Sequence, residues 1–325
     1  MKIYTASQLL DKVNAYLEQM PYMRPPKGLY EPIAYELSLG GKRIRPVLML
    51  MAYNIYKEDV ETILPQAAGL ETYHNHTLLH DDVMDKADMR RNKPTVHNVW
   101  NENTAILSGD AMLILAYRLM TECPKEKLAE VLHTFTETTM EICEGQQWDM
   151  EFETRMDVKV DEYIEMIRLK TSVLLAAALK IGACLAGAPD EDAQKLYDFG
   201  VKMGLAFQLQ DDWLDVYGDS KVFGKKIGGD ILCNKKTYML ITALERADDR
   251  QRAELERWLA IDEPLEEKIV AVTAIYNEIG VGGFCEEKIE ALYSEGLAIL
   301  ESVDLPNEKK GMLRTFACSL MGRKV

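Results

Sequence analysis

The chain spells Asp81-Asp82-Val83-Met84-Asp85 in its first half and repeats the pattern as Asp211-Asp212-Trp213-Leu214-Asp215. Each copy ends a run of apolar residues that recur with helical spacing. Residues i and i+4 of a helix share a face, so the first and last Asp of each copy point the same way. The two stretches therefore predict two helices, each ending in a pair of carboxylates.

Such carboxylate pairs need a cation, because two Asp side chains one turn apart repel each other. Hard carboxylate oxygens suit Mg²⁺, which proteins commonly bind through one or two carboxylates together with substrate phosphates. In a chain with 53 acidic residues, one acidic pentapeptide alone would be read as a solvated helix face. Two copies at the ends of apolar helices instead favour a diphosphate bridged by magnesium.

The length and composition are those of a globular protein with a sizeable core. At 325 residues, two domains would be the default from length, but no linker divides the chain, so we expect a single domain over residues 1–325. Hydrophobic residues make up 47% and charged residues 28%. No repeat of 20 to 50 residues appears, which argues against a solenoid.

The net charge of −15 argues against a nucleic-acid or anionic-membrane surface, since either would need a broad basic field. The six cysteines are scattered without a Cys-x-x-Cys pair or a secretory leader, which predicts reduced thiols and a cytoplasmic protein. The most apolar stretch runs from Thr171 to Leu179 and is interrupted by Lys180, so we expect it to be too short to span a membrane.

Helical periodicity is frequent and strand signals are weak, so the sequence predicts an all-α fold. Residues 88–95, which include Pro94, should form a loop, and a Gly-rich loop should extend to about residue 230. Further helical segments are expected around 280–283. The expected helices cover residues 5–17, 30–39, 46–56, 61–85, 103–120, 125–143, 160–186, 190–217 and 236–246.

Two short basic stretches lie near the first acidic pattern. The stretch Gly40-Gly41-Lys42-Arg43-Ile44-Arg45-Pro46 combines cations with glycines that let backbone approach an anion, just before an expected helix start. Arg90 and Arg91 follow the first acidic pattern, and two adjacent guanidinium groups can bind two different phosphates. His74 precedes the same acidic pattern by about two helical turns.

The second acidic pattern has its own basic neighbours. Lys170-Thr171 lies within an otherwise apolar helix, where a lysine either extends its amine to solvent or serves a function. Lys225, Lys226 and Lys235 follow the second pattern, and Gln208 precedes it by about one turn.

Taken in order, these motifs resemble the trans-polyprenyl diphosphate synthase family, the farnesyl and geranylgeranyl diphosphate synthases. The resemblance spans roughly Gly40 to Lys236. It implies an isoprenoid-synthase-type helical bundle around a deep central cavity, with the two Asp clusters facing each other across its mouth, and a homodimer. The motifs that carry it are Gly40–Pro46, Asp81–Asp85 with Arg90-Arg91, Lys170-Thr171, Phe207–Asp215 and Gly224–Asp230.

The resemblance also implies a role for each motif residue. Asp81, Asp85 and Asp211 would bind three Mg²⁺ ions that hold an allylic diphosphate, with Asp82 and Asp215 as supporting members. The contacts to the allylic diphosphate would come from Arg90, Lys170, Thr171, Gln208, Lys225 and Lys235. The contacts to isopentenyl diphosphate would come from Lys42, Arg45, His74 and Arg91.

These roles imply a magnesium-dependent head-to-tail (1'-4) condensation of isopentenyl diphosphate with an allylic diphosphate. The cations would stabilise charge on the departing diphosphate while the allylic C–O bond ionises, and the isopentenyl double bond would attack the resulting carbocation. Asp81, Asp85, Asp211, Arg90, Lys170 and Lys225 are the residues expected to act in this step.

Product length should depend on the helix that carries Asp81. In the family, bulk at the fourth, fifth and eighth positions before the first Asp sets the stop; here these are Thr77, His76 and Tyr73. Short-chain members often have an aromatic residue at the fourth or fifth position, and this chain does not. We therefore expect geranylgeranyl diphosphate, with farnesyl diphosphate next and a longer chain as an alternative if Tyr73 is bypassed or only packs.

Three other readings share some of these features. A class I terpene cyclase would share the fold and first Asp cluster, but its second metal site is usually of an Asn/Ser/Glu type. A non-catalytic subunit of a two-component synthase usually lacks one cluster, and both are present here. A helical scaffold would leave Arg90-Arg91, Lys170-Thr171 and Lys225 unexplained.

Overall fold

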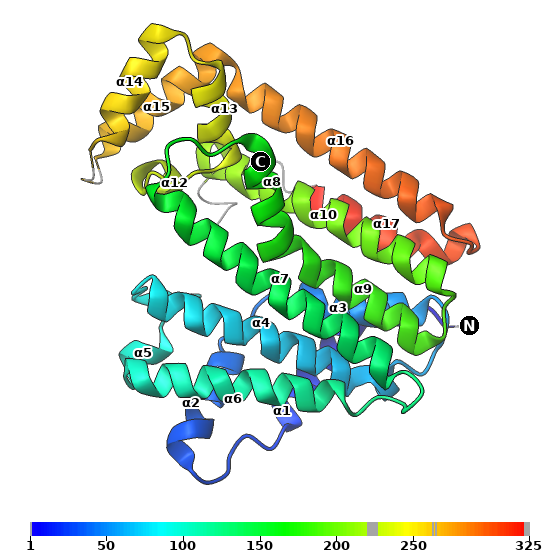
Figure 1. Cartoon of the computed structure of the whole chain (residues 1–325). Helices are drawn as coiled ribbons and strands as arrows, with labels where there is room; N and C mark the ends of the chain where they lie inside the picture. Colours follow the sequence, from blue (N-terminus) through cyan, green and yellow to red (C-terminus); the bar gives the residue numbers. More distant parts are fainter. Residues whose placement is uncertain (1, 220–226, 262, 264, 322–325) are drawn as a thin grey trace. The chain divides into compact units, whose positions relative to one another are not determined.

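The computed structural model describes residues 2–219, 227–261, 263 and 265–321 (Figure 1). Within these ranges the chain is helical apart from one pair of two-residue strands, which confirms the predicted all-α class. It forms two compact units, the first comprising Met1–Thr136 with Ala177–Tyr197 and the second Glu137–Ala176 with Asp198–Val325.

The first unit contains the N-terminal helices and the only strands among the described residues. Its elements are α1 (Ala6–Gln19), α2 (Lys27–Ser38), α3 (Ile44–Asn54), the 3₁₀ turn η1 (Val60–Ile63), α4 (Leu64–Met84), β1 (Met89–Arg90), β2 (Lys93–Pro94), α5 (Val96–Val99) and α6 (Glu102–Met120). The unit boundaries fall inside three further helices, α7 (Leu128–Thr154), α9 (Val173–Ala186) and α10 (Asp190–Tyr217).

The second unit contains the remaining elements. They are α8 (Val160–Ile167), the π-helical turn η2 (Arg168–Ser172), α12 (Gly229–Leu232), α13 (Tyr238–Arg246), α14 (Asp249–Leu259), α15 (Glu266–Ile279), α16 (Val281–Ser302) and α17 (Asn307–Met321). Gly280 joins α15 to α16 with φ of +82°, a left-handed conformation that ends the first helix.

Most predicted helices are found within a few residues of their expected bounds. At α1, Thr5 and Gln8 form the reciprocal capping bonds expected of a helix start, and α10 has the predicted bounds. Two expectations were wrong. Helix α7 continues to Thr154, beyond the predicted end at Cys143, and residues 88–95 contain a hairpin instead of a plain loop.

The hairpin turns at Arg91 and Asn92, both of which have positive φ (52° and 62°). Positive φ at both central residues is the signature of a type I′ turn, whose twist matches that of two antiparallel strands. Arg90 pairs with Lys93 on either side of this turn. The two adjacent arginines of the sequence motif therefore occupy different positions, one on a strand and one in the turn.

The first unit packs around the antiparallel pair α4 and α6 (Figure 1). Gly109 makes room for the His80 ring between the two helices, because a Cβ added there would lie 2.2 Å from His80 Nε2. A buried cluster next to this pair connects α2 to α4 and α6 through Ile33, Leu37, Leu79 and Met112. The carboxyl end of α4, which carries the first Asp cluster, therefore rests on a packed core.

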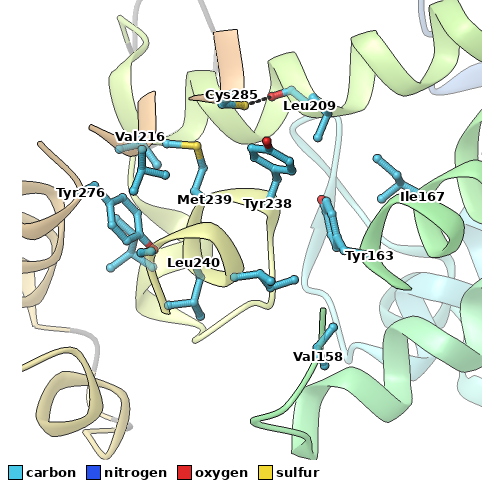
Figure 2. Close-up of a cluster of buried hydrophobic side chains, with 14 of the residues drawn as sticks. Val158, Tyr163, Ile167, Leu209, Val216, Tyr238, Met239, Leu240, Tyr276 and Cys285 are labelled. Atoms are coloured by element: carbon cyan, nitrogen blue, oxygen red, sulfur yellow. Dashed lines mark hydrogen bonds between the residues drawn. The ribbon is translucent and has the colours of Figure 1, made fainter. Parts of the chain in front are cut away.

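The second unit has a core formed by α8, α10, α13, α14, α15 and α16. Figure 2 shows part of it, with Tyr163, Tyr238 and Tyr276 among the buried aromatic residues. The Sγ of Cys285 donates to the backbone oxygen of Leu209 at 3.6 Å, which joins α16 to α10. The second Asp cluster thus follows a well-packed segment of α10.

The apolar helix near the centre of the chain spans the residues that the sequence predicted, 160–186. Val160–Ala186 is helical over 27 residues and has a window of mean hydropathy 1.6, so it meets the length and composition of a membrane span. The apolar window is therefore longer than the expected stretch Thr171–Leu179, so its length alone does not rule out a membrane span. However, 83% of the window is buried inside the protein, which identifies it as a core helix.

Candidate active site

The first Asp cluster forms the last turn of α4. Asp81 is half-buried, Asp82 is only 1% exposed, and Asp85 is exposed at the helix end, where its N–H donates to the Asp81 carbonyl at 2.8 Å. The unpaired carbonyls of a helix end carry partial negative charge, so acidic side chains are unfavourable there without a cation. Asp81 and Asp85 are the two carboxylates of this cluster that solvent reaches.

Asp82 is held by the hairpin. Arg90 donates to it from Nε at 3.1 Å and from Nη2 at 2.5 Å, both to Oδ1, and Nε also lies 3.2 Å from Oδ2. Arg90 is 30% exposed and Asp82 is 2% exposed at the side chain. The pair fixes the position of Arg90, which also lies near enough to Asp81 to feel its charge, so Asp82 has a structural partner of its own.

Arg91 lies against the glycines of the first basic stretch. Its Nη1 donates to the carbonyl of Gly40, and a Cβ added to Gly41 would lie 2.8 Å from its guanidinium carbon. Gly41 also has a φ of +129°, which L side chains rarely adopt. The glycine pair is therefore needed both for backbone conformation and for the close approach of Arg91.

The three cations of this stretch have different surroundings. Arg43 is buried and donates to Glu71 Oε1 and to the carbonyl of Leu37, both at 2.6 Å, so it connects helices. Lys42 is exposed. The Nη1 of Arg45 lies 3.0 Å from Nε2 of His74, and its Nε is buried with no hydrogen-bond partner among the described residues.

His74 is neutral in this arrangement. An arginine N–H can only donate, so Nε2 of His74 accepts the bond from Arg45. Burial lowers the pKa of His74 well below its ordinary value, and the charges of Arg45 and Arg91 act in the same direction. A neutral imidazole between cations leaves the local positive charge undiminished for an anion.

Glu36 is a buried acid that the sequence analysis did not identify. It is 0% exposed, and neither carboxylate oxygen has a hydrogen-bond partner among the described residues. Burial, and then the nearby Asp82, raise its pKa to about 7 against the opposing charges of Arg91, Arg90 and Arg43. The basic group of the first unit thus contains a carboxyl that is close to neutral at physiological pH.

The second Asp cluster differs from the first in exposure. Asp211 is half-buried, whereas Asp212 and Asp215 are only 3% and 8% exposed. Asp215 Oδ2 accepts the backbone N–H of Asp230 at 3.0 Å, which ties α10 to α12. Like the first cluster, this one lies in the last turns of its helix, where a bound cation would offset the negative end of the helix dipole.

Asp212 accepts hydrogen bonds from two side chains and one backbone N–H. Its Oδ2 accepts from the hydroxyl of Tyr163 at 2.5 Å and from the backbone N–H of Tyr238 at 3.4 Å, and its Oδ1 accepts from Gln208 Nε2 at 3.3 Å. Burial raises the pKa of Asp212 to about 7, although the bonds from Tyr163 and Gln208 oppose this shift.

Lys170 and Thr171 lie in the π-helical turn, a feature found often at functional sites. Lys170 Nζ donates to Asp149 of α7 at 2.5 Å, and Thr171 Oγ1 donates to Gln208 Oε1 at 3.4 Å. Asp149 was not predicted, although Gly145 and Asp149 on one helix face are a signal that could have identified it.

The other two lysines predicted to contact the allylic diphosphate are Lys225 and Lys235. Lys235 is exposed, and its backbone N–H donates to the carbonyl of Asp230 at 2.9 Å. Asn234, just before it in the same loop, has a φ of +56°. Lys225, like Lys226, lies outside the described residues. The second unit thus brings Lys170, Thr171, Gln208 and Asp212 together, with Lys235 linked through its backbone to Asp230.

The residues predicted to set product length lie on two faces of α4. Tyr73 is 2% exposed and packs edge-on against Phe135 of α7, with ring centroids 5.4 Å apart. His76 is turned toward α6, where Nδ1 lies 2.9 Å from the carbonyl of Gly109. Thr77 is half-buried and precedes Asp81 by one turn, so these two share a face.

The donor set fits magnesium better than an all-protein metal site. Among the described residues, no group of three or more His, Cys, Asp and Glu side chains is close enough to hold a metal ion. Asp81 and Asp85 provide two accessible carboxylates, the first of them near Arg90, and Mg²⁺ typically takes one or two carboxylates plus substrate phosphates and water. The residues therefore fit a magnesium ion that arrives with a diphosphate.

Comparison with known proteins gives the family. The polyprenyl synthetase family model matches residues 26–279. A short chain isoprenyl diphosphate synthase of Methanocaldococcus jannaschii is 42% identical over 248 residues, which cover 76% of this chain and 75% of that protein.

Solved structures agree with this assignment. A crystal structure of a geranylgeranyl pyrophosphate synthase has a TM-score of 0.94 at 42% identity, covering 99% of this chain and all of that one. A geranylgeranyl pyrophosphate synthase from Corynebacterium glutamicum, solved with isoprenyl diphosphate and magnesium, has a TM-score of 0.85 at 28% identity and covers 98% of each chain.

The chain therefore belongs to the polyprenyl synthetase family. It has the isoprenoid synthase fold and is a prenyltransferase of the geranylgeranyl or farnesyl diphosphate synthase type, as the sequence predicted. Enzymes of this family use a divalent metal and bind isopentenyl and allylic diphosphates.

Proposed function

We propose that this chain condenses isopentenyl diphosphate with allylic diphosphates in a magnesium-dependent 1'-4 reaction, with geranylgeranyl diphosphate as its main product. The observation that carries the proposal is the end of α4, where Asp81 and Asp85 are accessible and Arg90 is fixed near Asp81 through Asp82. This arrangement provides a place for a metal-bound diphosphate in a chain that is otherwise strongly acidic.

The allylic diphosphate is bound by residues of both motif groups. Asp81, Asp85 and Asp211 hold its magnesium ions, three per site, and Asp82 and Asp215 support them by fixing Arg90 and the start of α12. Bound magnesium would stabilise the negative charge that develops on the leaving diphosphate. The residues that contact this diphosphate are Arg90, Lys170, Thr171, Gln208, Lys225 and Lys235.

Isopentenyl diphosphate binds to the basic group of the first unit. Lys42, Arg45 and Arg91 supply the charge, and Nε of Arg45 is a buried donor without an acceptor in the part of the chain that the structure describes. Neutral His74 accepts from Arg45 and so fixes the direction of its guanidinium. Binding energy from these contacts holds the double bond near the reacting carbon, which makes the attack effectively intramolecular.

The product stops at the geranylgeranyl length because the first large obstacle on α4 lies two turns before Asp81. Thr77, one turn before Asp81, is small, and His76 faces α6. Tyr73 packs against Phe135, and Phe135 in turn packs against Tyr117 with ring centroids 4.9 Å apart. A tyrosine held in this way resists displacement by a growing chain.

The active protein is a homodimer in the cytoplasm. One face of α6 exposes Leu107 (60%) and Ile114 (70%), which are seven residues apart and therefore on the same side of the helix. An exposed apolar stripe of this kind supports an interface with a second copy.

The test is incubation of purified protein with Mg²⁺, isopentenyl diphosphate and each of dimethylallyl, geranyl and farnesyl diphosphate, followed by mass spectrometry of the products. We expect elongation from each starter, ending at the geranylgeranyl length. Asp81→Ala and Asp211→Ala should reduce turnover by about 100-fold or more, whereas Asp249→Asn, an exposed position on α14, serves as the control. A folded, magnesium-loaded protein that elongates no starter would contradict the proposal.

A further inference from the structure

A chain of hydrogen bonds connects a buried residue outside the sequence motifs to the predicted diphosphate ligands. It begins at Tyr163 of α8, which is 1% exposed and whose hydroxyl donates to Asp212. It continues from Asp212 to the side-chain amide of Gln208, and from Gln208 to the hydroxyl of Thr171. The first and last residues of this hydrogen-bonded series, Tyr163 and Thr171, lie on the helical segment 160–172, and its two middle residues lie on α10.

The bonds in this chain have a fixed direction. The backbone N–H of Tyr238 can only donate, so Asp212 acts as an acceptor. The amide nitrogen of Gln208 points to Asp212, and its carbonyl oxygen is then left to accept from Thr171. An Asp212 side chain that is held in place therefore determines the orientation of the Gln208 amide, and this in turn determines the direction of the Thr171 hydroxyl.

The π-helical turn places Tyr163 and Thr171 on the same side of their helical segment. Tyr163 and Thr171 are eight residues apart, about 2.2 turns of a regular α-helix, which would separate their directions by about 80°. A π turn absorbs one additional residue, so the effective spacing is about seven residues, or about 1.9 turns. Tyr163 and Thr171 can then both reach α10, at Asp212 and at Gln208 one turn earlier.

The helices around the π turn are adapted to it. A Cβ added to Gly145 of α7 would lie 2.4 Å from the backbone nitrogen of Lys170. A Cβ added to Gly204 of α10 would lie 2.6 Å from Cα of Ser172. Two neighbouring helices therefore approach the wider turn through glycines, so the alignment of Tyr163 with Thr171 is built into the packing.

We propose that Tyr163 is a positioning residue for allylic diphosphate binding, acting through Asp212 on Gln208 and Thr171. The inference rests on the diphosphate-binding role proposed above for these two residues. Tyr163 does not touch the substrate. Its hydroxyl holds the carboxylate that orients the two groups that do.

The test compares Tyr163→Phe with Tyr238→Phe. Phenylalanine at 163 keeps the buried ring and removes only the hydroxyl that Asp212 needs. Tyr238 belongs to the same buried cluster (Figure 2) but reaches Asp212 through its backbone N–H, which survives the substitution. We expect the KM for geranyl diphosphate to rise about tenfold in Tyr163→Phe, the cost of one hydrogen bond to a charged group. The KM for isopentenyl diphosphate should stay within twofold, and Tyr238→Phe should match the wild type.

The path through Asp212 is tested by a double-mutant cycle. If Tyr163 acts only through Asp212, the variant carrying Tyr163→Phe and Asp212→Asn should have the same KM for geranyl diphosphate as Asp212→Asn alone. Additive effects would contradict this path. Equal increases in both KM values, or an unchanged KM in Tyr163→Phe, would contradict the positioning role while leaving the proposed function intact. A wild-type chain that does not condense the two substrates would contradict the proposed function itself.

Discussion

The guanidinium of Arg90 lies against the carboxylate of Asp82, with Nη2 2.5 Å from Oδ1, and the two side chains differ in exposure, at 30% and 2%. The partially exposed Arg90 side chain is thus held in place by the buried Asp82 carboxylate. Since the i, i+4 geometry of α4 leaves Asp81 and Asp85 on the accessible face, the second Asp of the pattern is the one available to the hairpin. One acidic pentapeptide therefore serves two purposes, accessible metal ligands and a buried counter-charge.

Arg90→Ala should lower the free energy of unfolding by about 2–4 kcal/mol, because it leaves the buried Asp82 carboxylate without its partner. Arg90→Lys keeps the charge but cannot match two oxygens at once, so most of the stability should return while the KM for allylic diphosphate rises about tenfold. Urea denaturation and steady-state kinetics measure the two effects. An Arg90→Ala variant as stable as the wild type would show that the pair has no structural role.

Glu36 should make the protein less stable as the pH rises. Its pKa is about 7 in the folded chain against an ordinary value of 4.5. Between these values the folded state keeps a proton that the unfolded state releases, so the free energy of unfolding falls by about 3 kcal/mol across this range. The stabilisation is complete below pH 4.5 and is lost as the pH passes 7.

Glu36→Gln should therefore lose less stability than the wild type between pH 4.5 and 8 when both are measured in urea with a chelator present. Some slope will remain, because the pKa of Asp212 is raised in the same direction. Glu278→Gln is a control of opposite sign, since the hydrogen bond from Arg250 lowers the pKa of Glu278. Identical pH profiles for Glu36→Gln and the wild type would refute the assignment.

The sequence predicts those features that depend on spacing. The bounds of α10 follow from a polar start at Asp190 and the glycine after Tyr217, and the accessible pair Asp81 and Asp85 follows from the helical period. The burial of a side chain cannot be predicted from residue spacing in the same way. Arg43 and Arg45 are two positions apart in one motif, and each has a buried Nε without an acceptor among the described residues. Yet Arg43 forms an ion pair with Glu71, whereas Arg45 lies against His74.

The π turn also escapes sequence analysis, because the same residues favour α and π geometry and only the packing of neighbouring helices distinguishes them. Tyr163 was missed for a related reason. It lies in an apolar periodic segment, where a tyrosine is read as core, and its function depends on a contact with Asp212 that is 49 positions away in sequence.

Gly204→Ala should destabilise the protein by about 1–3 kcal/mol and weaken allylic diphosphate binding, because the new methyl group would overlap the backbone at Ser172. Gly311→Ala, inside α17 with no atom within 4 Å of the added Cβ, should instead stabilise it by about 0.5–1 kcal/mol. Thermal unfolding and the KM for geranyl diphosphate distinguish the two. A Gly204→Ala variant that behaves like Gly311→Ala would mean that the π turn tolerates displacement.

Tyr73→Ala should lengthen the product, because it removes the ring that lies two turns before Asp81. The substitution also empties a buried aromatic position and should cost about 3–5 kcal/mol of stability, so the assay needs a temperature well below unfolding. Mass spectrometry of the products gives the length. Products of unchanged length from a folded Tyr73→Ala protein would show that Tyr73 only packs against Phe135.

Thr77→Phe should shorten the product to farnesyl diphosphate. Thr77 is half-buried and one turn before Asp81 on the same face, so an aromatic ring there meets the growing chain before Tyr73 does. The hydroxyl of Thr77 donates to the carbonyl of His74 within the same helix, at 2.8 Å, so its loss should cost little stability. Thr77→Val, which adds no ring, is the matched control and should keep the geranylgeranyl length. A Thr77→Phe enzyme that still makes the longer product would mean that the growing product does not pass this face of α4. Tyr73 could then not limit the product length either.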